Sequence, residues 1–445
     1  MTKASKPWKR RTAVASPAVA FVGRHNSGKT TLIERVIGEM TARGFDVGSV
    51  KHHSHAGFDI DIPGKDSYRH RAAGATDTVI AAPGQVARIS TIEGEMECSE
   101  ILETMPGHDI VVVEGYRKSG LPTIEIMRAA NAADAAVAQA FLQAARNEAP
   151  LGTDFIQMAR AKMHADRAGG AGSANGADSG AVPEAHADDL AHKMPTGATV
   201  AVVTDIPDAQ EAARIYGIPA FGIDDIAPLC DFLEVEYVRR RITVAIQAGG
   251  ESKRMGRSKA TVPFAGRPLI CRLVERLSPV ADYLLITTNE AENLGFLKDE
   301  FPHREIRLVP DVYDFRGALP GIYSALKAAE SEYVAIVACD MVCASPALVA
   351  REAAVMAATR ADVVVPVNKH GFEPFHALYR RSTCLPVVEA AVEAGEQRAQ
   401  GIFSKVNVCE LSQVEVLQAE PMGGCFINVN TPEELKMMEK AFAEE

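Results

Sequence analysis

Aromatic residues are scarce in this chain, at 6% of 445 residues with a single Trp, which argues against a surface that stacks nucleic-acid bases. Long hydrophobic runs are also missing, since the longest, such as Tyr333–Cys339, are only strand-length and a membrane span needs ~20 residues. The eight cysteines form no C-x-x-C pair. They are interpreted as buried thiols in a reducing cytoplasm.

Basic residues are outnumbered, with 47 Lys and Arg against 58 Asp and Glu, for a net charge of −11. An acidic chain is a poor general partner for nucleic acid, although a local basic site for phosphates stays open. The 47% hydrophobic and 24% charged composition excludes wholesale disorder, a collagen-like sequence and a disulfide scaffold. A basic tail, 1–14, resembles an export signal in outline, but the apolar stretch behind it runs directly into a phosphate-loop motif, which cleavage would destroy.

The length predicts two or three domains. Composition changes abruptly at 129–195, where the first part is Ala-rich and could form helix and the later part is Gly/Ser-rich. We interpret this stretch as an insertion without a site, because the strand at 198–204 and the helix at 224–233 are too few for a domain and complete the N-terminal sheet. The charged run 234–241 marks the boundary, so the predicted domains are 15–236 and 237–445.

Apolar strands alternate with helical patterns in the second half. Strands are expected at 242–246, 283–288, 307–309, 333–339 and 362–367, and helices around 269–277, 321–330 and 346–358. Continuous apolar strands alternating with helices indicate parallel sheets covered on both faces. The predicted fold class is therefore α/β, with two parallel-sheet, three-layer α/β domains.

The first half opens with a strand, 18–22, that leads through a Gly-rich loop into a helix at 31–40. The loop fits G-x-x-x-x-G-K-[ST], in which backbone N–H groups surround phosphate oxygens at a helix N-terminus. Lys29 supplies a positive charge to the β and γ phosphates, and the Thr30 hydroxyl is a candidate Mg²⁺ ligand. The predicted nucleotide-binding residues are Gly23, Asn26, Ser27, Gly28, Lys29, Thr30 and Thr31.

Two further features accompany this loop. Glu114 ends a buried strand at 109–115, so its carboxylate is expected beside the loop, where it would position metal or water. His52, His53 and His55 lie within four residues and could bind a transition metal. A polar loop that contacts nucleotide or a partner is the favoured interpretation, since no Cys and no helical His pair lie nearby.

Several segments of the first half resemble the molybdopterin-guanine dinucleotide biosynthesis adaptor family (MobB type). The segments are 51–53, 59–67, 69–75, 113–116 and 124–128. The resemblance covers about 15–128 and resumes at 198–236. It implies a P-loop protein that binds GTP at Gly23–Thr30 and assists nucleotidylation of the molybdenum cofactor.

The second half opens with another strand and Gly-rich loop, but of a different kind. Gln247-Ala248-Gly249-Gly250 is followed by two spaced cations, Arg254 and Lys259, and no G-K-[ST] is present. Such a loop suits a nucleoside triphosphate attacked at its α phosphate: Arg254 would hold the leaving phosphates and Lys259 would neutralise the developing charge. Asp340 ends a buried strand, where a carboxylate suits Mg²⁺ or caps a helix.

The second half, over about 242–440, resembles the molybdenum cofactor guanylyltransferase family (MobA type). The matching motifs are 248–259, Asp311 before 317–321, Cys339-Asp340-Met341, and 428–435. The resemblance implies a Rossmann-like nucleotidyltransferase fold. It implies nucleotide binding by Asn289, Asp311, Asn428 and Asn430, with Asp340 as Mg²⁺ ligand. Val342 replaces the family's Pro, and Ala318 and Pro320 exchange their usual order, which affects loop rigidity but removes no cation or carboxylate.

Together these patterns predict a fusion of a P-loop adaptor with a nucleotidyltransferase. The implied substrates are GTP and molybdenum-molybdopterin, with Mg²⁺ as cofactor. Proteins that deliver molybdopterin and apo-molybdoenzymes are candidate partners, and neither nucleic acid nor membrane is expected. The alternatives are a cytidylyl- or sugar-nucleotidyltransferase of the same fold, or a non-catalytic pterin carrier or metallochaperone.

Overall fold

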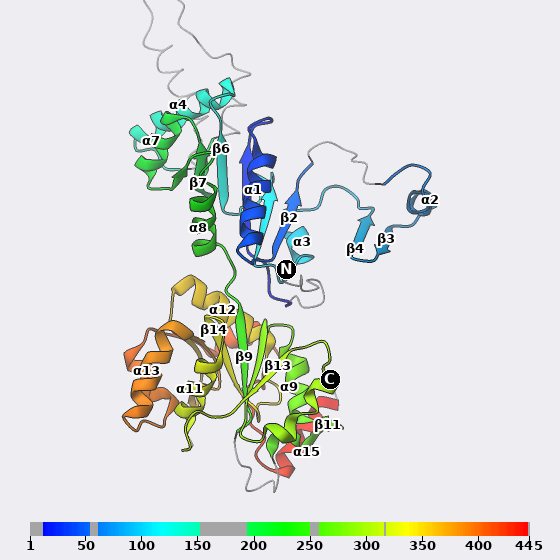
Figure 1. The fold of residues 1–445 in the computed structure, drawn as a ribbon, viewed down its shortest axis with the longest axis vertical. Helices are drawn as coiled ribbons and strands as arrows, with labels where there is room; N and C mark the ends of the chain where they lie inside the picture. The colour runs from blue at the N-terminus through cyan, green and yellow to red at the C-terminus, as the bar shows by residue number, and fades with distance from the viewer. Residues whose placement is uncertain (1–11, 54–60, 152–193, 250–257, 316, 444–445) are drawn as a thin grey trace, which may run out of the picture. The chain divides into compact units, whose positions relative to one another are not determined.

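The computed structural model describes residues 12–53, 61–151, 194–249, 258–315 and 317–443 (Figure 1). The chain divides into two compact units that meet between Arg239 and Arg240, and residues 12–14 group with the second unit. Gly250, Arg254 and His55 lie outside the described residues, as does most of the Gly-rich stretch. Among the described residues, no helix is long and apolar enough to cross a membrane.

The first unit is built on a parallel six-stranded sheet of order β2-β5-β1-β6-β7-β8. The strands are β1 (Ala18–Gly23), β2 (Val47–Lys51), β5 (Ile110–Glu114), β6 (Thr123–Met127), β7 (Thr199–Thr204) and β8 (Ala220–Phe221). The central strands are apolar and buried along most of their length because helices cover both faces.

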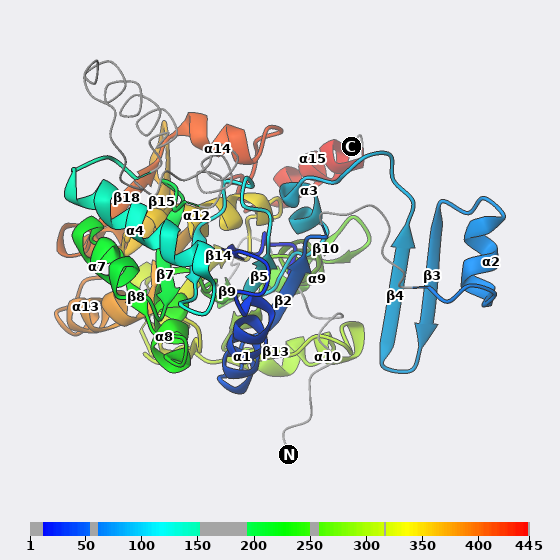
Figure 2. The same ribbon diagram turned by 90° about the horizontal axis from the view of Figure 1, so that it is seen from above.

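Helices α1 (Lys29–Ala42) and α8 (Ile226–Glu236) share one apolar cluster with the sheet. Other clusters contain α3 (Cys98–Glu103), α4 (Ala132–Arg146) and α7 (Pro207–Tyr216). Helix α2 (Asp66–Ala72) and the hairpin of β3 (Asp77–Ala82) and β4 (Gln85–Ser90) stand apart from the main sheet (Figure 2).

The Ala-rich part of the expected insertion is core structure, which corrects the sequence analysis. Asn131 caps α4 by accepting from the Ala133 N–H at 3.1 Å. Phe141 is fully buried and stacks on Tyr216 of α7 at 5.3 Å between ring centroids. Helix α4 therefore belongs to the crossover between the parallel strands β6 and β7, and the insertion was started too early at 129. Alanine spacing hid the buried face, because small side chains give a weak periodic signal.

The second unit contains a larger sheet of order β13-β12-β9-β14-β17-β15-β16, with β18 beside β15. The strands are β9 (Ile242–Gln247), β12 (Tyr283–Thr287), β13 (Ile306–Val309), β14 (Tyr333–Ala338), β15 (Val363–Asn368), β16 (Gly371–Phe372), β17 (His376–Arg380) and β18 (Val408–Leu411). The α/β class is confirmed, but this sheet is mixed, since β17 runs antiparallel to β14 and β15. The sequence pattern predicted only parallel strands here and gave no signal for β17 and β18.

Helices cover both faces of the second sheet. One core contains α9 (Leu269–Leu277), α12 (Pro346–Thr359), α14 (Gln413–Ala419) and α15 (Pro432–Ala443), and the other contains α11 (Ala318–Ala328) and α13 (Arg381–Glu393). Short helical segments lie at Lys259–Thr261, Ala291–Leu294, Leu297–Glu300 and Ala399–Lys405, and a small hairpin joins β10 (Pro263–Phe264) to β11 (Arg267–Pro268). The predicted helix at 269–277 coincides with α9.

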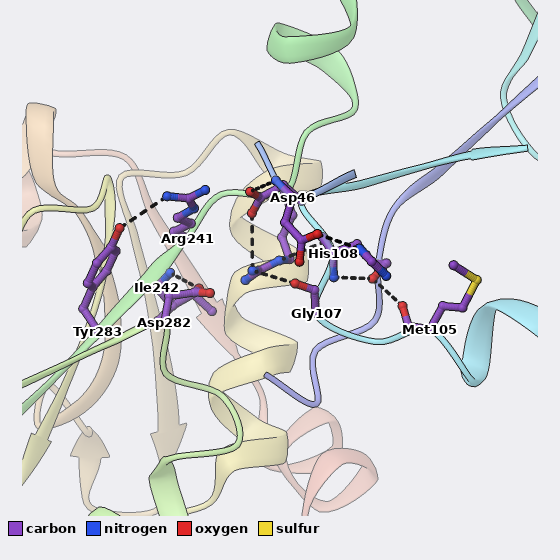
Figure 3. Close-up of polar contacts among 11 residues, drawn as sticks. Asp46, Met105, Gly107, His108, Arg241, Ile242, Asp282 and Tyr283 are labelled. Carbon is purple, nitrogen blue, oxygen red and sulfur yellow. Dashed lines mark hydrogen bonds and ion pairs between the residues drawn. The ribbon is translucent and has the colours of Figure 1, made fainter. Parts of the chain in front are cut away.

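The residues on either side of the boundary are each fixed within their own unit. In the first unit, the backbone N–H of Arg239 donates to the Asp109 carbonyl at 2.7 Å. In the second, the Ile242 N–H donates to a carboxylate oxygen of Asp282 at 2.8 Å, and Arg241 reaches the Tyr283 hydroxyl (Figure 3). Only two residues, 240 and 241, lie between these backbone anchors.

Candidate functional site

The first candidate site is the loop between β1 and α1. Asn26 and Gly28 have left-handed backbone conformations, with φ of 60° and 78°, which curl the loop before the helix begins. A Cβ on Gly23 would lie 2.7 Å from the Ile126 carbonyl oxygen, so only glycine fits there. The Ser27 hydroxyl is buried and has no hydrogen-bond partner within the described part of the chain. A phosphate oxygen would satisfy it.

Three predicted side chains meet beside this loop. The Lys29 ammonium donates to the carbonyl oxygens of Gly23 and Arg24 at 3.0 and 2.5 Å, so it lies along the loop. The Thr30 hydroxyl, one residue into α1, donates to a Glu114 carboxylate oxygen at 3.1 Å. The Glu114 carboxylate therefore lies beside the loop. Thr31 is exposed on the first turn of α1.

A buried carboxylate that the sequence analysis missed supports the loop. Asp134 of α4 pairs with Arg24 at 3.4 Å and accepts the backbone N–H of Arg128 at 3.0 Å. Burial raises the pKa of Asp134, and the charge of Arg24 opposes that shift. Arg128 in turn pairs with Asp205, which follows β7. Asp134 escaped notice because it falls in the Ala-rich stretch that was set aside as an insertion.

Substitution of Gly23 by Ala tests the tight turn. The added methyl collides with backbone, so we expect a loss of about 1–3 kcal/mol in unfolding free energy. We also expect at least a ~10-fold loss of nucleotide affinity, because the loop must move. Gly38→Ala on α1 is the matched control: it meets no atom within 4 Å and should gain ~0.5–1 kcal/mol. Thermal melts and fluorescent-nucleotide titration measure both, and equal behaviour of the two variants would contradict the role of Gly23.

The described histidines of the His cluster form no metal site. His52 contacts Glu95, Nε2 to Oε1, at 2.5 Å and stacks on Tyr116 at 4.3 Å. No group of three His, Cys, Asp or Glu side chains suited to a metal occurs within the described ranges. His52 thus contacts a carboxylate and an aromatic ring of its own unit, and His55 lies outside the described residues.

The second candidate site is a cavity of about 450 Å³ at the carboxyl ends of β9, β12 and β14. It is lined by Gln247, Ala248, Gly249, Lys259, Thr287, Asp311, Phe315, Gly317, Ala318, Pro320, Gly321, Ala338, Cys339, Asp340, Met341, Glu373, Phe375 and Asn428. Ligands of open α/β sheets bind at this edge. Seven of the predicted site residues are in this lining.

Lys259 joins the two loops that carry the predicted metal and ligand groups. Its ammonium donates to an Asp340 carboxylate oxygen at 2.9 Å and to the Asn430 side-chain oxygen at 2.7 Å. The backbone N–H of Val429 donates to the Asp340 carbonyl at 3.0 Å, and Met341 forms an antiparallel bridge with Asn428. Residues far apart in sequence thus converge on one charged cluster in the cavity wall.

A second polar pair borders the same cavity. Asn289 donates to an Asp311 carboxylate oxygen at 3.0 Å, and its own oxygen accepts the Asp311 N–H at 2.9 Å. A Cβ on Gly249 would lie 3.1 Å from that carboxylate, so the glycine lets the loop pass close to Asp311. The side-chain nitrogen of Gln247 is buried without a partner in the described structure.

The structure adds lining residues that the motifs did not reveal. Phe315 is 44% exposed and forms part of the wall, and Glu373 and Phe375 enter from the turn before β17. No spacing pattern marks these residues, because they come from an irregular loop and from the turn before a strand that was missed. The residues around the exchanged Ala318 and Pro320 still line the cavity, and Val342 is buried behind it.

Comparison with known proteins finds a family match in each half of the chain. A family model described as molybdopterin guanine dinucleotide synthesis protein B matches residues 18–145, and a MobA-like NTP transferase domain model matches 244–411. The molybdenum cofactor guanylyltransferase of Desulfosudis oleivorans is 34% identical over 202 residues, which cover 45% of this chain and 95% of that protein. The chain belongs to the molybdenum cofactor guanylyltransferase family.

Further relatives of this family match the same half. The probable molybdenum cofactor guanylyltransferase of Carboxydothermus hydrogenoformans is 34% identical over 213 residues, covering 46% of this chain and 98% of that protein. The crystal structure of molybdopterin-guanine dinucleotide biosynthesis protein A from Archaeoglobus fulgidus has 22% identity and a TM-score of 0.41, with 46% and 100% coverage. With the match to the first half, the predicted fusion with a guanylyltransferase-family nucleotidyltransferase is confirmed. The first match runs through α4 to residue 145.

Proposed function

We propose that the chain transfers GMP from GTP to molybdenum-molybdopterin, forming molybdopterin-guanine dinucleotide and pyrophosphate. Family membership supports this reaction. The observation that carries it is the contact of Lys259, which lines the cavity, with Asp340 in the same wall and with Asn430 beside it. A cation held between a carboxylate and an amide oxygen marks the place where phosphates would be exchanged.

The chemistry proposed for the cavity needs no covalent enzyme intermediate. The terminal phosphate of the pterin attacks the α phosphorus in line, and pyrophosphate leaves. That phosphate is already ionised at pH 7, so a general base is unnecessary. Lys259 would neutralise charge at the α phosphate, and Arg254 is proposed to hold the leaving group. Asn289 and Asp311 are proposed to position the nucleoside, with Gln247, Ala248, Gly249, Gly250 and Asn428 completing the wall.

Asp340 fits a Mg²⁺ ion in its donor chemistry. Mg²⁺ prefers oxygen ligands and is usually held by one or two carboxylates together with substrate phosphates. Asp340 offers such a carboxylate at the end of β14, with the Asn430 oxygen close to the same ammonium. When bound, the metal would supply positive charge at the phosphates. Thr30 and Glu114 are the corresponding proposal for the first site.

We propose that the first unit holds a second GTP at Gly23–Thr30 and assists the transfer, within a domain extending over about 15–236. The Ser27 hydroxyl, which has no partner among the described residues, and the position of Lys29 along the loop support phosphate binding there. All eight cysteines are free thiols, which supports the proposal of a reducing cytoplasm.

Pyrophosphate release tests the proposed function. Purified protein is mixed with Mg²⁺, molybdopterin and either GTP, CTP or ATP, and pyrophosphate and the dinucleotide product are quantified. We expect release with GTP and pterin together, and at least ~10² times less with CTP or ATP, because a base is rejected when it leaves buried polar groups unpaired. Preference for CTP would indicate a cytidylyltransferase, and absence of release with every nucleotide would indicate a carrier.

A further inference from the structure

A fully buried pair of ionisable side chains lies behind the transfer cavity and has no part in the proposed chemistry. His376 begins β17 and Glu352 lies on α12, and both side chains are 0% exposed. The Nδ1 of His376 lies 3.3 Å from a Glu352 carboxylate oxygen. Burying such a pair rarely adds net stability, since well-packed apolar residues often do as well or better. Stability alone therefore does not account for it.

The hydrogen bonds select one tautomer of the histidine. The backbone N–H of Ser345 donates to His376 Nε2 at 3.0 Å, so Nε2 must carry a lone pair. The ring proton then resides on Nδ1 and donates to Glu352. Burial raises the Glu352 pKa to about 7, while the bond from His376 opposes that shift. Both ring nitrogens are thus used, and the imidazole has one orientation.

His376 is attached to both ends of the loop that carries Asp340. On β17 it lies opposite Val337 of β14, three residues before Asp340. Through Nε2 it binds Ser345, which caps α12 by accepting the Leu348 N–H at 3.2 Å. The short loop between β14 and α12 is therefore anchored at its start and at its end by the same residue.

The same ring also contacts the loop that carries Asn428 and Asn430. Phe426 packs edge-on against His376, with ring centroids 5.6 Å apart and an interplanar angle of 88°. Beyond Phe426, the Val429 N–H binds the Asp340 carbonyl. One imidazole consequently supports both loops from the side away from the cavity.

On the cavity side, Lys259 ties the two loops together. If the Lys259 ammonium turns to a phosphate of the substrate, as the proposed function requires, these two bonds are weakened or lost. The support behind the loops then determines whether Asp340 and Asn430 keep their places. A displacement of about 1 Å at such groups costs on the order of 10² in rate.

We infer that His376, oriented by Glu352, is a positioning residue that holds the Asp340 loop and the Asn428–Asn430 loop in register for nucleotidyl transfer. This inference rests on the proposed function. His376 does not line the cavity and takes no part in the chemistry.

A set of variants separates positioning from folding. His376→Gln retains an oxygen that can accept the Ser345 N–H, whereas the double variant His376→Leu with Glu352→Leu removes both polar groups and leaves an apolar core. We expect the double variant to melt close to the temperature of the unmodified protein, because the apolar replacement of the buried pair offsets the Ser345 N–H that it leaves unpaired. It should nevertheless lose about 10- to 100-fold in kcat with less than threefold change in KM for GTP. His376→Gln should restore kcat to within threefold.

Thr243→Val is the matched control. Its hydroxyl is buried and pairs with Ser331 at 2.6 Å, at the opposite end of β9 from the cavity. It likewise removes a buried polar contact, but we expect kcat within twofold of the unmodified protein. An equal kcat loss in this variant would overturn the positioning role, because loss of any buried pair would then suffice.

Hydrogen exchange gives a readout that does not depend on activity. The Ser345 amide and the amides at 341–344 and 427–430 should exchange faster in the double variant and near normally in His376→Gln. Normal kcat in the double variant, or a His376→Gln variant as slow as the double variant, would overturn the inference. If the unmodified protein releases no pyrophosphate, the proposed function fails, and exchange at Ser345 still decides whether His376 anchors the loops.

Discussion

Replacement of Asp340 by Asn should slow guanylyl transfer by about 10²-fold or more, because a charged group at the transition state is lost. Asn is nearly isosteric, so the melting temperature should not change. High Mg²⁺ or Mn²⁺ should restore part of the rate, since the neutral side chain still offers an oxygen. Steady-state pyrophosphate release across a metal titration, with thermal melts, measures all three effects.

The structure sharpens this test by removing one competing role. Ser345, and not Asp340, caps the helix that follows β14, so an Asn at 340 has no capping function to preserve. Ser345→Asn keeps a side chain that can cap α12, so it is the control for the effect of a substitution in the loop between β14 and α12. Near-normal turnover by Asp340→Asn would make Asp340 structural, and the metal would then be sought at Asp311 or Asn430.

Replacement of Lys29 by Ala should abolish GTP binding by the first unit while leaving guanylyl transfer intact. Lys29 supplies the positive charge of the phosphate loop, and the transfer cavity has its own cation in Lys259. Arg35→Ala on the same helix removes an exposed cation paired with Asp224 and should change nothing. Equilibrium titration should resolve two GTP sites in the unmodified protein and one in Lys29→Ala.

Transfer is measured on the same variant with the pterin supplied in excess. A full-length Lys29→Ala variant that loses transfer would show that the two sites are coupled, contrary to the independence expected here. Two sites of unchanged affinity would instead show that the first loop does not use Lys29 for binding.

The sequence predicted the elements whose signals are local. The phosphate loop carries its chemistry within eight consecutive residues, and α9 shows clear helical spacing, so both could be identified from the chain alone. The Ala-rich stretch of α4 could be expected to form helix, but its place in the core could not be predicted, since alanines make a buried face look like a low-complexity stretch. Strand β17 was missed because it joins the sheet out of sequence order, antiparallel between β14 and β15.

In the candidate sites too, residues with a local sequence signal could be predicted and residues that depend on the fold could not. Lys259, Asp340 and Asn430 belong to motifs, so their types could be anticipated, but their meeting in one cluster depends on the fold. Asp134 and His376 belong to no motif that we could recognise. Asp134 acts through its ion pair with Arg24, and His376 acts through the hydrogen bond from Ser345. A linear pattern contains neither of these long-range contacts.

The joint between the units has a kinetic consequence. Arg239 is bound to Asp109 of the first unit and Ile242 to Asp282 of the second, with two residues between them, so this covalent connection between the adaptor and the transferase is short. Association of the two domains within one chain is therefore intramolecular and independent of protein concentration. Short linkers commonly give an effective concentration in the millimolar range. Any assistance that the adaptor gives the transferase within one chain should persist on dilution, whereas the same two domains made as separate chains would lose it.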